Sequence, residues 1–208
     1  MTPLTVNHWR RLPATLLLLA LSLAGFLLVY LSAPLDWIGA LTFSPFRVEG
    51  RELVFFTQPG QYWRYLTPVF LHFGWLHIVF NSLWLWQLGG NLELQLGPWS
   101  LLTLVVLIGA GSNTAQHLQG GAALFGGMSG VVFGLLGFSL VYGRLKPVAA
   151  LWLPSGIVWF MLGWLVFCML APTERLGLGS IANTAHLSGL LLGFGLGLPA
   201  LGWSKLGR

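Results

Sequence analysis

Two residues in this sequence could together carry out acyl transfer. Ser129 lies in Gly127-Met128-Ser129-Gly130 at the start of one apolar run, and His186 lies near the start of another. A serine hydroxyl and a histidine base are the minimum needed for nucleophilic attack on an acyl group. Polar side chains inside apolar segments are energetically costly and usually functional. The sequence therefore predicts Ser129 as a nucleophile and His186 as its base at membrane depth.

His77 and Asn81 form a second polar pair, spaced i, i+4 so that they share one face of a helix. Side chains of these types can donate hydrogen bonds to a tetrahedral oxyanion, and one such donor is worth about 10²–10³ in rate. A metal site built from His72, His77, His117 and His186 is the competing interpretation. No cysteine or carboxylate lies at this depth, so we expect no metal.

Each of these signals also has an ordinary structural interpretation. In a chain with 28 glycines, the glycines around Ser129 could simply let helices pack closely. A lone histidine could be a hydrogen-bonded core residue. His186 is followed by Gly189 and Gly193 at i+3 and i+7, and this face could pack tightly on the segment that carries Ser129. The functional interpretation therefore depends on the two residues meeting.

The composition is that of a helical membrane protein. Of the 208 residues 56% are hydrophobic and 7% are charged, with a mean hydropathy of +0.79; soluble domains carry about 25% charged residues. The net charge of +5 comes from Lys and Arg residues that lie near the ends of apolar segments. This placement favours a role in setting membrane topology over nucleic-acid binding. Cys168 is the only cysteine, so no internal disulfide can form.

We predict an all-α polytopic protein, a single membrane domain over residues 1–208 with six spans. The expected spans are 13–33, 67–90, 99–119, 126–143, 148–170 and 181–201. The first resembles a signal peptide, but Pro34 follows the position where cleavage would occur, so we expect an uncleaved span. The connection 34–66 is rich in aromatic and charged residues and should form an interfacial loop.

Basic residues predict the orientation of these spans. With six spans, one side carries Arg10, Arg11, Arg144, Lys146, Lys205 and Arg208. We expect this side, and both termini, to be cytoplasmic. The polar residues of spans two, four and six then lie in the outer half of the bilayer at a similar depth, at about 1.5 Å of rise per residue.

Four motifs in order resemble the rhomboid family of intramembrane serine proteases, in particular its bacterial GlpG-type branch. They are Trp63-Arg64, His77-x-x-x-Asn81, Gly127-Met128-Ser129-Gly130 and Ala185-His186-x-x-Gly189-x-x-x-Gly193. The resemblance implies a six-helix bundle with a Ser–His dyad. Ser129 would be the nucleophile, and His186 the general base and later the general acid. The backbone N–H of Ser129 and the side chains of His77 and Asn81 would form the oxyanion hole.

The same resemblance implies roles for residues around the dyad. Gly126 and Gly127 would shape the loop beside the nucleophile, and Phe80, Trp84 and Trp159 would line a lateral gate between spans two and five, unless they are ordinary lipid-facing aromatics. Trp63-Arg64 and Glu93 would stabilise the fold. Phe133 stands where that branch usually has a tyrosine against the base. The connection 171–180 is longer than in that branch, and a soluble amino-terminal domain found in some relatives is not expected here.

The implied activity is cleavage of transmembrane segments through an acyl-enzyme, without cofactor or metal. Transmembrane proteins and the lipid bilayer are the expected partners, nucleic acid is not, and the oligomeric state stays open. The expected location is the bacterial inner membrane, with the active site opening to the periplasmic side. Two alternatives remain: an inactive relative that binds transmembrane segments, or a processor of carboxy-terminal anchors on exported proteins. A transporter would more often carry carboxylates in mid-span, where this sequence has none.

Overall fold

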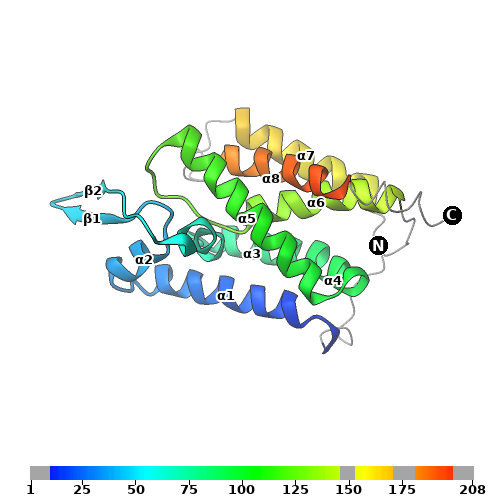
Figure 1. Ribbon diagram of the computed structural model, residues 1–208, viewed down its shortest axis with the longest axis horizontal. Helices are drawn as coiled ribbons and strands as arrows, with labels where there is room; N and C mark the ends of the chain where they lie inside the picture. The colour runs from blue at the N-terminus through cyan, green and yellow to red at the C-terminus, as the bar shows by residue number, and fades with distance from the viewer. Residues whose placement is uncertain (1–9, 146–152, 171–180, 199–208) are drawn as a thin grey trace.

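The computed structural model describes residues 10–145, 153–170 and 181–198, and these form a mainly helical bundle (Figure 1). Its helices are α1 (Pro13–Tyr30), α2 (Leu35–Leu41), α3 (Trp75–Trp84), α4 (Gly90–Leu96), α5 (Pro98–Gly120), α6 (Ser129–Leu145), α7 (Ser155–Leu170) and α8 (Asn183–Gly197). Two 3₁₀ turns, η2 (Tyr62–Tyr65) and η3 (Thr67–Phe70), precede α3. The expected helical class is confirmed.

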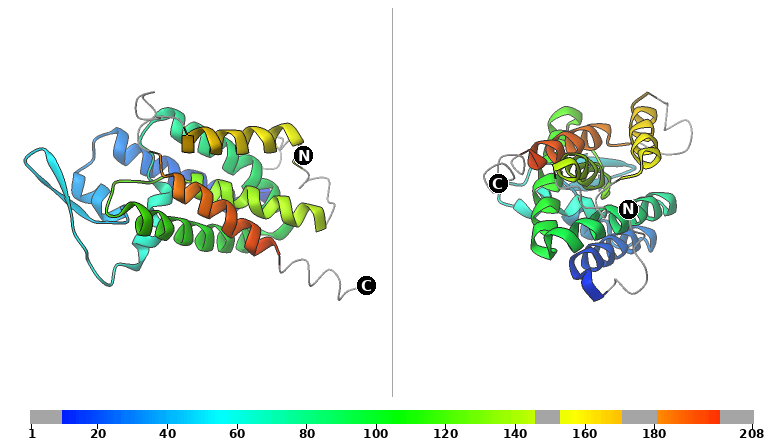
Figure 2. Two further views of the ribbon diagram at one scale, coloured as in Figure 1. Left: turned by 90° about the horizontal axis from the view of Figure 1, so that it is seen from above. Right: turned by 90° about the vertical axis from the view of Figure 1, so that its right-hand side faces the viewer.

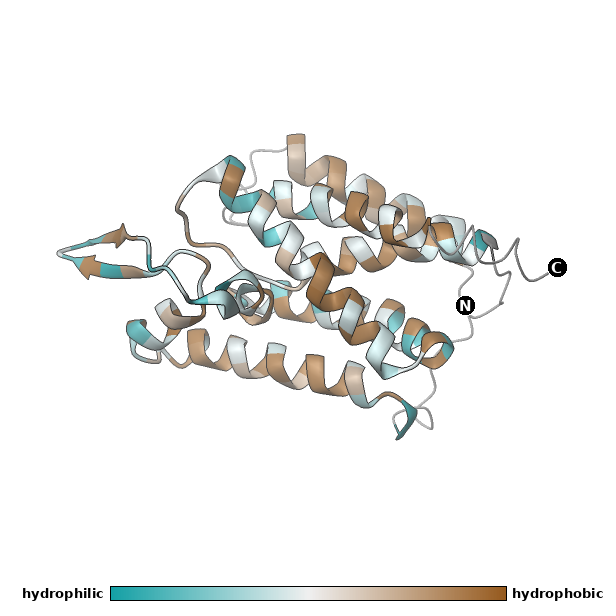
Figure 3. Cartoon of the chain, in the orientation of Figure 1, coloured by the Kyte–Doolittle hydropathy of each residue, from teal (hydrophilic) through white to brown (hydrophobic). Residues whose placement is uncertain are grey.

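Helix length and composition identify two clear candidate membrane spans among the described residues. The 18 residues of α1 have a mean hydropathy of 2.1, and an 18-residue window of the 23-residue helix α5 reaches 1.2. The helices α6 and α7 are apolar but shorter. Hydrophobic residues cover most of the helix bodies, and hydrophilic residues gather at helix ends and on the hairpin (Figure 3). The finer expectation of six spans is not decided by these lengths.

Helix α6 lies in the interior of the bundle (Figure 2). Every residue from 130 to 139 is buried, including Val131, Leu135 and Leu136, which are fully inaccessible. A helix that is apolar on all sides must be covered on all sides, and α6 packs against α8, α5 and α3. The first residue of this central helix is Ser129.

The carboxylate of Glu93 caps the start of α1. It accepts hydrogen bonds from the backbone N–H groups of Ala14 and Thr15 at 2.8 and 2.7 Å, and from the Thr15 hydroxyl at 2.6 Å. Helix α1 has no side-chain cap of its own, and its free N–H groups and dipole favour an anion. Glu93 is 2% exposed, so this contact joins α4 to α1 inside the protein.

The connection 34–66 is folded. It contains α2, an antiparallel hairpin of β1 (Phe46–Glu49) and β2 (Glu52–Phe55), and η2. The buried Arg64 guanidinium donates to the carbonyls of Gly39 and Thr42, and the Trp63 indole donates to the Ala40 carbonyl at 3.0 Å. Burial lowers the pKa of Arg64. These bonds hold η2 against α2.

The expected boundaries of the second span, 67–90, need correction. Pro68 opens only the 3₁₀ turn η3, after which Leu71 and Gly74 are extended and break the helix. The helix begins at Trp75 and continues through a π-helical turn, η4 (Leu85–Gly89), into α4, which ends at Leu96. The continuous helix thus begins and ends further along the sequence than expected.

Each of the other expected spans overlaps one helix of the structure: α1, α5, α6, α7 and α8 in chain order. The fifth, 148–170, contains α7, which begins after Pro154; positions 148–152 lie outside the described residues. The end of the sixth, 199–201, and the connection 171–180, with its expected greater length, also lie outside them.

Candidate active site

The structure brings Ser129 and His186 into direct contact. The Oγ atom of Ser129 lies 2.7 Å from Nε2 of His186. Ser129 is the first residue of α6, and His186 lies in the first turn of α8. Ser129 is half-buried and His186 is 6% exposed. An accessible hydroxyl within hydrogen-bond distance of an imidazole nitrogen is an arrangement that can make a serine nucleophilic.

Glycines bring the two helices close enough for this contact. A Cβ atom added to Gly189 would collide with the carbonyl oxygen of Gly130, and one added to Gly193 would collide with that of Gly134. Helices α6 and α8 therefore pack backbone against backbone along one face. His186 lies one turn before Gly189 on that face, so the same packing sets its distance from Ser129.

His77 and Asn81 lie beside the loop that precedes Ser129. A Cβ atom added to Gly127 would lie 2.6 Å from Cε1 of His77 and 3.6 Å from Nδ2 of Asn81. Gly127 has φ +114°, which an L side chain rarely adopts. Both polar side chains therefore face the backbone two residues before the serine.

His72 is a site-supporting residue whose role the sequence did not reveal. Its Nδ1 lies 3.0 Å from the Phe70 carbonyl, so Nδ1 carries the proton, and Nε2 accepts from the backbone N–H of Met128 at 3.5 Å. Its ring is fully buried and packs against His77, with ring centroids 4.9 Å apart. Residues five apart do not share a face of a helix, so nothing in the sequence indicated that His72 contacts His77. The contact forms because the segment between them is extended and not helical.

Two further contacts fix the loop and the base. The N–H of Gly127 donates to the Pro68 carbonyl at 2.9 Å, and a Cβ on Gly126 would lie 2.8 Å from the same oxygen. The Phe133 ring lies against His186, with centroids 5.1 Å apart and planes 40° from parallel. The imidazole is therefore held between a hydroxyl and an aromatic ring.

The aromatic contacts between α3 and α7 differ from those expected. Phe80 stacks on Trp164 with centroids 6.4 Å apart, and Trp84 lies 6.2 Å from Phe160. Trp159 is 73% exposed and makes none of the ring contacts found among the described residues. The spacing of Phe160 and Trp164, four residues like that of Phe80 and Trp84, is the signal that could have identified them.

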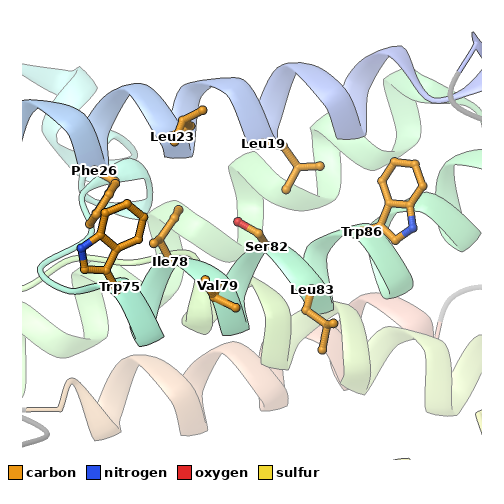
Figure 4. Close-up of a pocket in the computed structure, with 9 residues that line it drawn as sticks. All are labelled: Leu19, Leu23, Phe26, Trp75, Ile78, Val79, Ser82, Leu83 and Trp86. Carbon is orange, nitrogen blue, oxygen red and sulfur yellow. The ribbon is translucent and has the colours of Figure 1, made fainter. Parts of the chain in front are cut away.

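A separate apolar groove of about 500 Å³ lies between α1 and α3 (Figure 4). Trp75 and Trp86 stand toward its two ends, and Ser82 supplies a hydroxyl to its wall. Neither Ser129 nor His186 lines it. The contact between Ser129 and His186 thus belongs to the packed interface of α6 and α8 and not to this groove.

Comparison with known proteins places this geometry in a family. The family model described as the Rhomboid domain matches residues 59–203. The chain is similar to the "Rhomboid protease GlpG" of Serratia proteamaculans, with 47% identity over 133 residues, and to that of Yersinia pestis, with 44% identity over 133 residues. Each alignment covers 64% of this chain and 46% of the relative, so the chain spans about half the length of the curated relatives it matches.

The matched region, from residue 59 to residue 203, contains α3 to α8 and every residue of the site described above. It covers well over half of the chain, and the resemblance to the GlpG-type branch expected from four motifs is confirmed. The chain belongs to the rhomboid family.

Proposed function

We propose that this protein is an intramembrane serine endopeptidase that cleaves transmembrane segments of other proteins. The observation that carries the proposal is the 2.7 Å distance between Ser129 Oγ and His186 Nε2. In this role Ser129 is the nucleophile and His186 the general base. The names of the similar proteins, which are rhomboid proteases, agree with this activity.

The reaction follows from the protonation states of this pair. His186 Nε2 takes the hydroxyl proton as Ser129 Oγ attacks the substrate carbonyl carbon, and the carbonyl oxygen becomes an oxyanion. His186 then gives the proton to the leaving amine, and an acyl-enzyme remains. Water, deprotonated by the same imidazole, attacks the ester and releases the acid product and Ser129. No cofactor or metal takes part in these steps.

Oxyanion stabilisation is assigned to the backbone N–H of Ser129 and the side chains of His77 and Asn81. Ser129 is the first residue of α6, so its N–H has no partner within the helix. His77 and Asn81 lie against Gly127, which has no side chain to block the path to the serine. Donors placed in advance of the reaction are the most effective means of stabilising such charge.

Substrate entry is assigned to the contact between α3 and α7. Only Met161, Leu165 and Cys168 of α7 are buried, at spacings that form one narrow stripe. The rest of the contact with α3 includes the pairs Phe80–Trp164 and Trp84–Phe160. A helix that buries only one stripe of side chains can separate from its neighbour more easily than can α6, which is buried along 130–139. We therefore place the entry of a transmembrane segment at α7.

The proposed setting is a bacterial cell membrane, with six spans forming one domain over residues 1–208 and both termini in the cytoplasm. Large exposed apolar side chains on α1, α3 and α7 fit a lipid environment, for example Leu23 at 51%, Leu76 at 67% and Leu170 at 81%. Transmembrane proteins are the proposed substrates, and the active site would open toward the periplasm.

The test compares the parent protein with Ser129→Ala and His186→Ala, reconstituted with a model single-span substrate. Each substitution should lower kcat for cleavage by at least about 10³-fold, because nucleophile and base act as one unit. A serine-directed fluorophosphonate should label the parent and not Ser129→Ala. Ser139→Ala is the matched control, since Ser139 is another buried serine of α6, at 4% exposure.

Folding of each variant is checked by its thermal transition in the same detergent. A folded parent that cleaves none of several substrates and does not label would overturn the protease assignment. It would leave binding of transmembrane segments as the function of this fold.

A further inference from the structure

Two buried polar atoms at the start of α8 have no hydrogen-bond partner among the described residues. They are Nδ1 of His186 and Oδ1 of Asn183. Leaving such an atom unpaired costs the free energy of its desolvation, so unpaired buried polar atoms in native structures call for a physical explanation. The His186 atom belongs to a side chain that is more than nine-tenths buried.

The two atoms belong to side chains one helical turn apart on α8. Asn183 is the first residue of α8, and His186 is three residues further on, where its N–H already donates to the Ala182 carbonyl. Side chains at i and i+3 lie on one face, with Cβ atoms about 5–6 Å apart. A single water molecule can bridge two polar groups whose separation is too large for a direct hydrogen bond.

The amide of Asn183 has only one possible orientation. Its Nδ2 donates to the Cys168 carbonyl at 2.8 Å, and that carbonyl belongs to the last turn of α7, where no intrahelical donor is available. A flipped amide would place two acceptors against each other. Oδ1 is therefore fixed as the free end of the side chain, and it is an acceptor.

The tautomer of His186 provides the complementary donor. As the base of the proposed function, Nε2 accepts a hydrogen bond from the Ser129 hydroxyl in the resting state, so it carries no hydrogen, and the hydrogen of the neutral ring lies on Nδ1. An unpaired N–H and an unpaired carbonyl oxygen thus lie one turn apart on α8. A water that accepts from the first and donates to the second satisfies both.

We propose that Asn183 is a positioning residue for His186, acting through one water between its Oδ1 and His186 Nδ1–H. This inference rests on the proposed function. The link would keep the hydrogen on Nδ1, which leaves Nε2 free to act as the base. When Nε2 takes the proton of Ser129, the ring becomes an imidazolium, and the polarised water stabilises it while the Nδ1 proton stays in place.

A neutral amide here takes the part that a carboxylate plays in a Ser-His-Asp triad. Among the described residues, the Ser129 hydroxyl and the Phe133 ring lie against the His186 ring, and His77 interacts with it electrostatically. The buried carboxylate of Glu93 is occupied at the start of α1. Because Asn183 also binds the Cys168 carbonyl, it connects the end of α7 to the base.

Two substitutions separate these roles of Asn183. Asn183→Asp keeps an acceptor toward His186 and removes the donor to Cys168, whereas Asn183→Leu removes both at similar volume. Hydrogen bonds to charged groups have a strength that corresponds to a change of about 10–100-fold. We expect Asn183→Leu to lower kcat and the fluorophosphonate labelling rate by this factor, with KM within about twofold. Asn183→Asp should stay within about threefold of the parent.

The tautomer of His186 can be measured without any cleavage assay. Nitrogen-15 NMR of the His186 ring, assigned by its loss in His186→Ala, should show the hydrogen on Nδ1 in the parent and in Asn183→Asp, and a mixture of tautomers in Asn183→Leu. Ser188→Ala, which removes a different polar group of α8, the Ser188 hydroxyl, is the matched control and should show the same tautomer as the parent. If Asn183→Leu does not fold, Asn183→Ala replaces it.

Two results would overturn the inference. In the first, folded Asn183→Leu has the same labelling rate and the same His186 tautomer as the parent. In the second, Asn183→Asp is as impaired as Asn183→Leu. The second result would mean that only the bond to Cys168 matters. Failure of the proposed function is distinct from both, because the parent would then neither label nor cleave. The tautomer of His186 would still test the link to Asn183 in that case.

Discussion

At the residue scale, the His186 ring has a different contact on each part of its surface. Nε2 faces the Ser129 hydroxyl at 2.7 Å, and the ring face meets Phe133 with centroids 5.1 Å apart. The aromatic contact is apolar and contributes no proton or hydrogen bond. Its contribution is therefore orientational, since it limits the rotation that would carry Nε2 away from Ser129.

Replacing Phe133 tests this orientational role. Phe133→Leu removes the ring while keeping much of its volume, and aromatic pairs contribute about 0.5–1.5 kcal/mol beyond burial. We expect the labelling rate of Ser129 by a fluorophosphonate to fall about 2- to 10-fold. Phe133→Tyr retains the ring and should label within about threefold of the parent.

The melting temperature of each Phe133 variant serves as the control, because Phe133 is 4% exposed and its loss also affects packing. Equal labelling rates for folded Phe133→Leu and the parent would mean that the helix backbone alone orients His186.

At the element scale, two helices that contribute to the site are held very differently. Helix α6 is buried along 130–139 and packs by glycines against α8. Helix α7 meets α3 through two aromatic pairs, Phe80–Trp164 and Trp84–Phe160. Opening between α3 and α7 breaks these two aromatic pairs, whereas separating α6 from α8 would break the contact between Ser129 and His186.

Removing one of these aromatic pairs should favour a state in which α3 and α7 are separated. Each pair contributes about 0.5–1.5 kcal/mol, so Phe160→Ala should raise cleavage of a transmembrane substrate about 2- to 10-fold. Labelling by a small fluorophosphonate, which does not require a helix to enter, should change less than cleavage does. The ratio of the two rates is the measurement.

Trp159 is the matched control for Phe160, because the two are neighbours on α7 and Trp159 is 73% exposed. Trp159→Ala should leave the ratio of cleavage to labelling unchanged. An equal rise in that ratio for both variants would contradict a role for the α3–α7 pairs and would indicate a general loosening of α7.

The same elements mark the limit of prediction from sequence. Apolar runs locate α1, α5 and α6 because a helix surrounded by apolar groups must be apolar over its length. The predicted start of the second span precedes the start of α3, because a proline typical of a first turn can equally open an isolated 3₁₀ turn. Which α7 aromatics face α3 depends on the rotation of that helix about its axis, and in a helix apolar on every side the four-residue spacing of Phe160 and Trp164 is the one sequence signal of it.

Within the site, residue type and shared depth point to Ser129 and His186, since a nucleophile and a base are chemically distinctive. His72 and Asn183 were not identified, because their roles depend on backbone atoms. His72 binds the N–H of Met128, and Asn183 binds the Cys168 carbonyl. Such bonds follow from the fold and leave no pattern of side-chain types in the sequence.

At the scale of the whole molecule, the positions of the helix ends bear on topology. The start of α1 and the end of α6 both lie at the end of the bundle opposite the β1–β2 hairpin (Figures 1 and 2). Arg10 and Arg11 precede α1, and Arg144 lies in the last turn of α6. Basic residues near span ends favour the cytoplasmic side, so the hairpin is expected on the periplasmic side.

Single cysteines test this orientation in the intact protein. Cys168 is the only native cysteine and is buried, so Cys168→Ala provides a cysteine-free parent. In that background, Glu49→Cys in the exposed hairpin should react with a membrane-impermeant maleimide in intact bacterial spheroplasts. Arg144→Cys should react only after the membrane is opened, because its end of the bundle would face the cytoplasm.

Reaction of both cysteines after lysis controls for their chemical accessibility, and cleavage activity of the Cys168→Ala parent controls for its fold. The opposite labelling pattern would reverse the orientation and place Ser129 toward the cytoplasm. Labelling of both sites in intact spheroplasts would contradict a membrane barrier between the hairpin and the end of α6. That result would remove the physical basis for a site at membrane depth, because the apolar length of α6 would then not separate two aqueous sides.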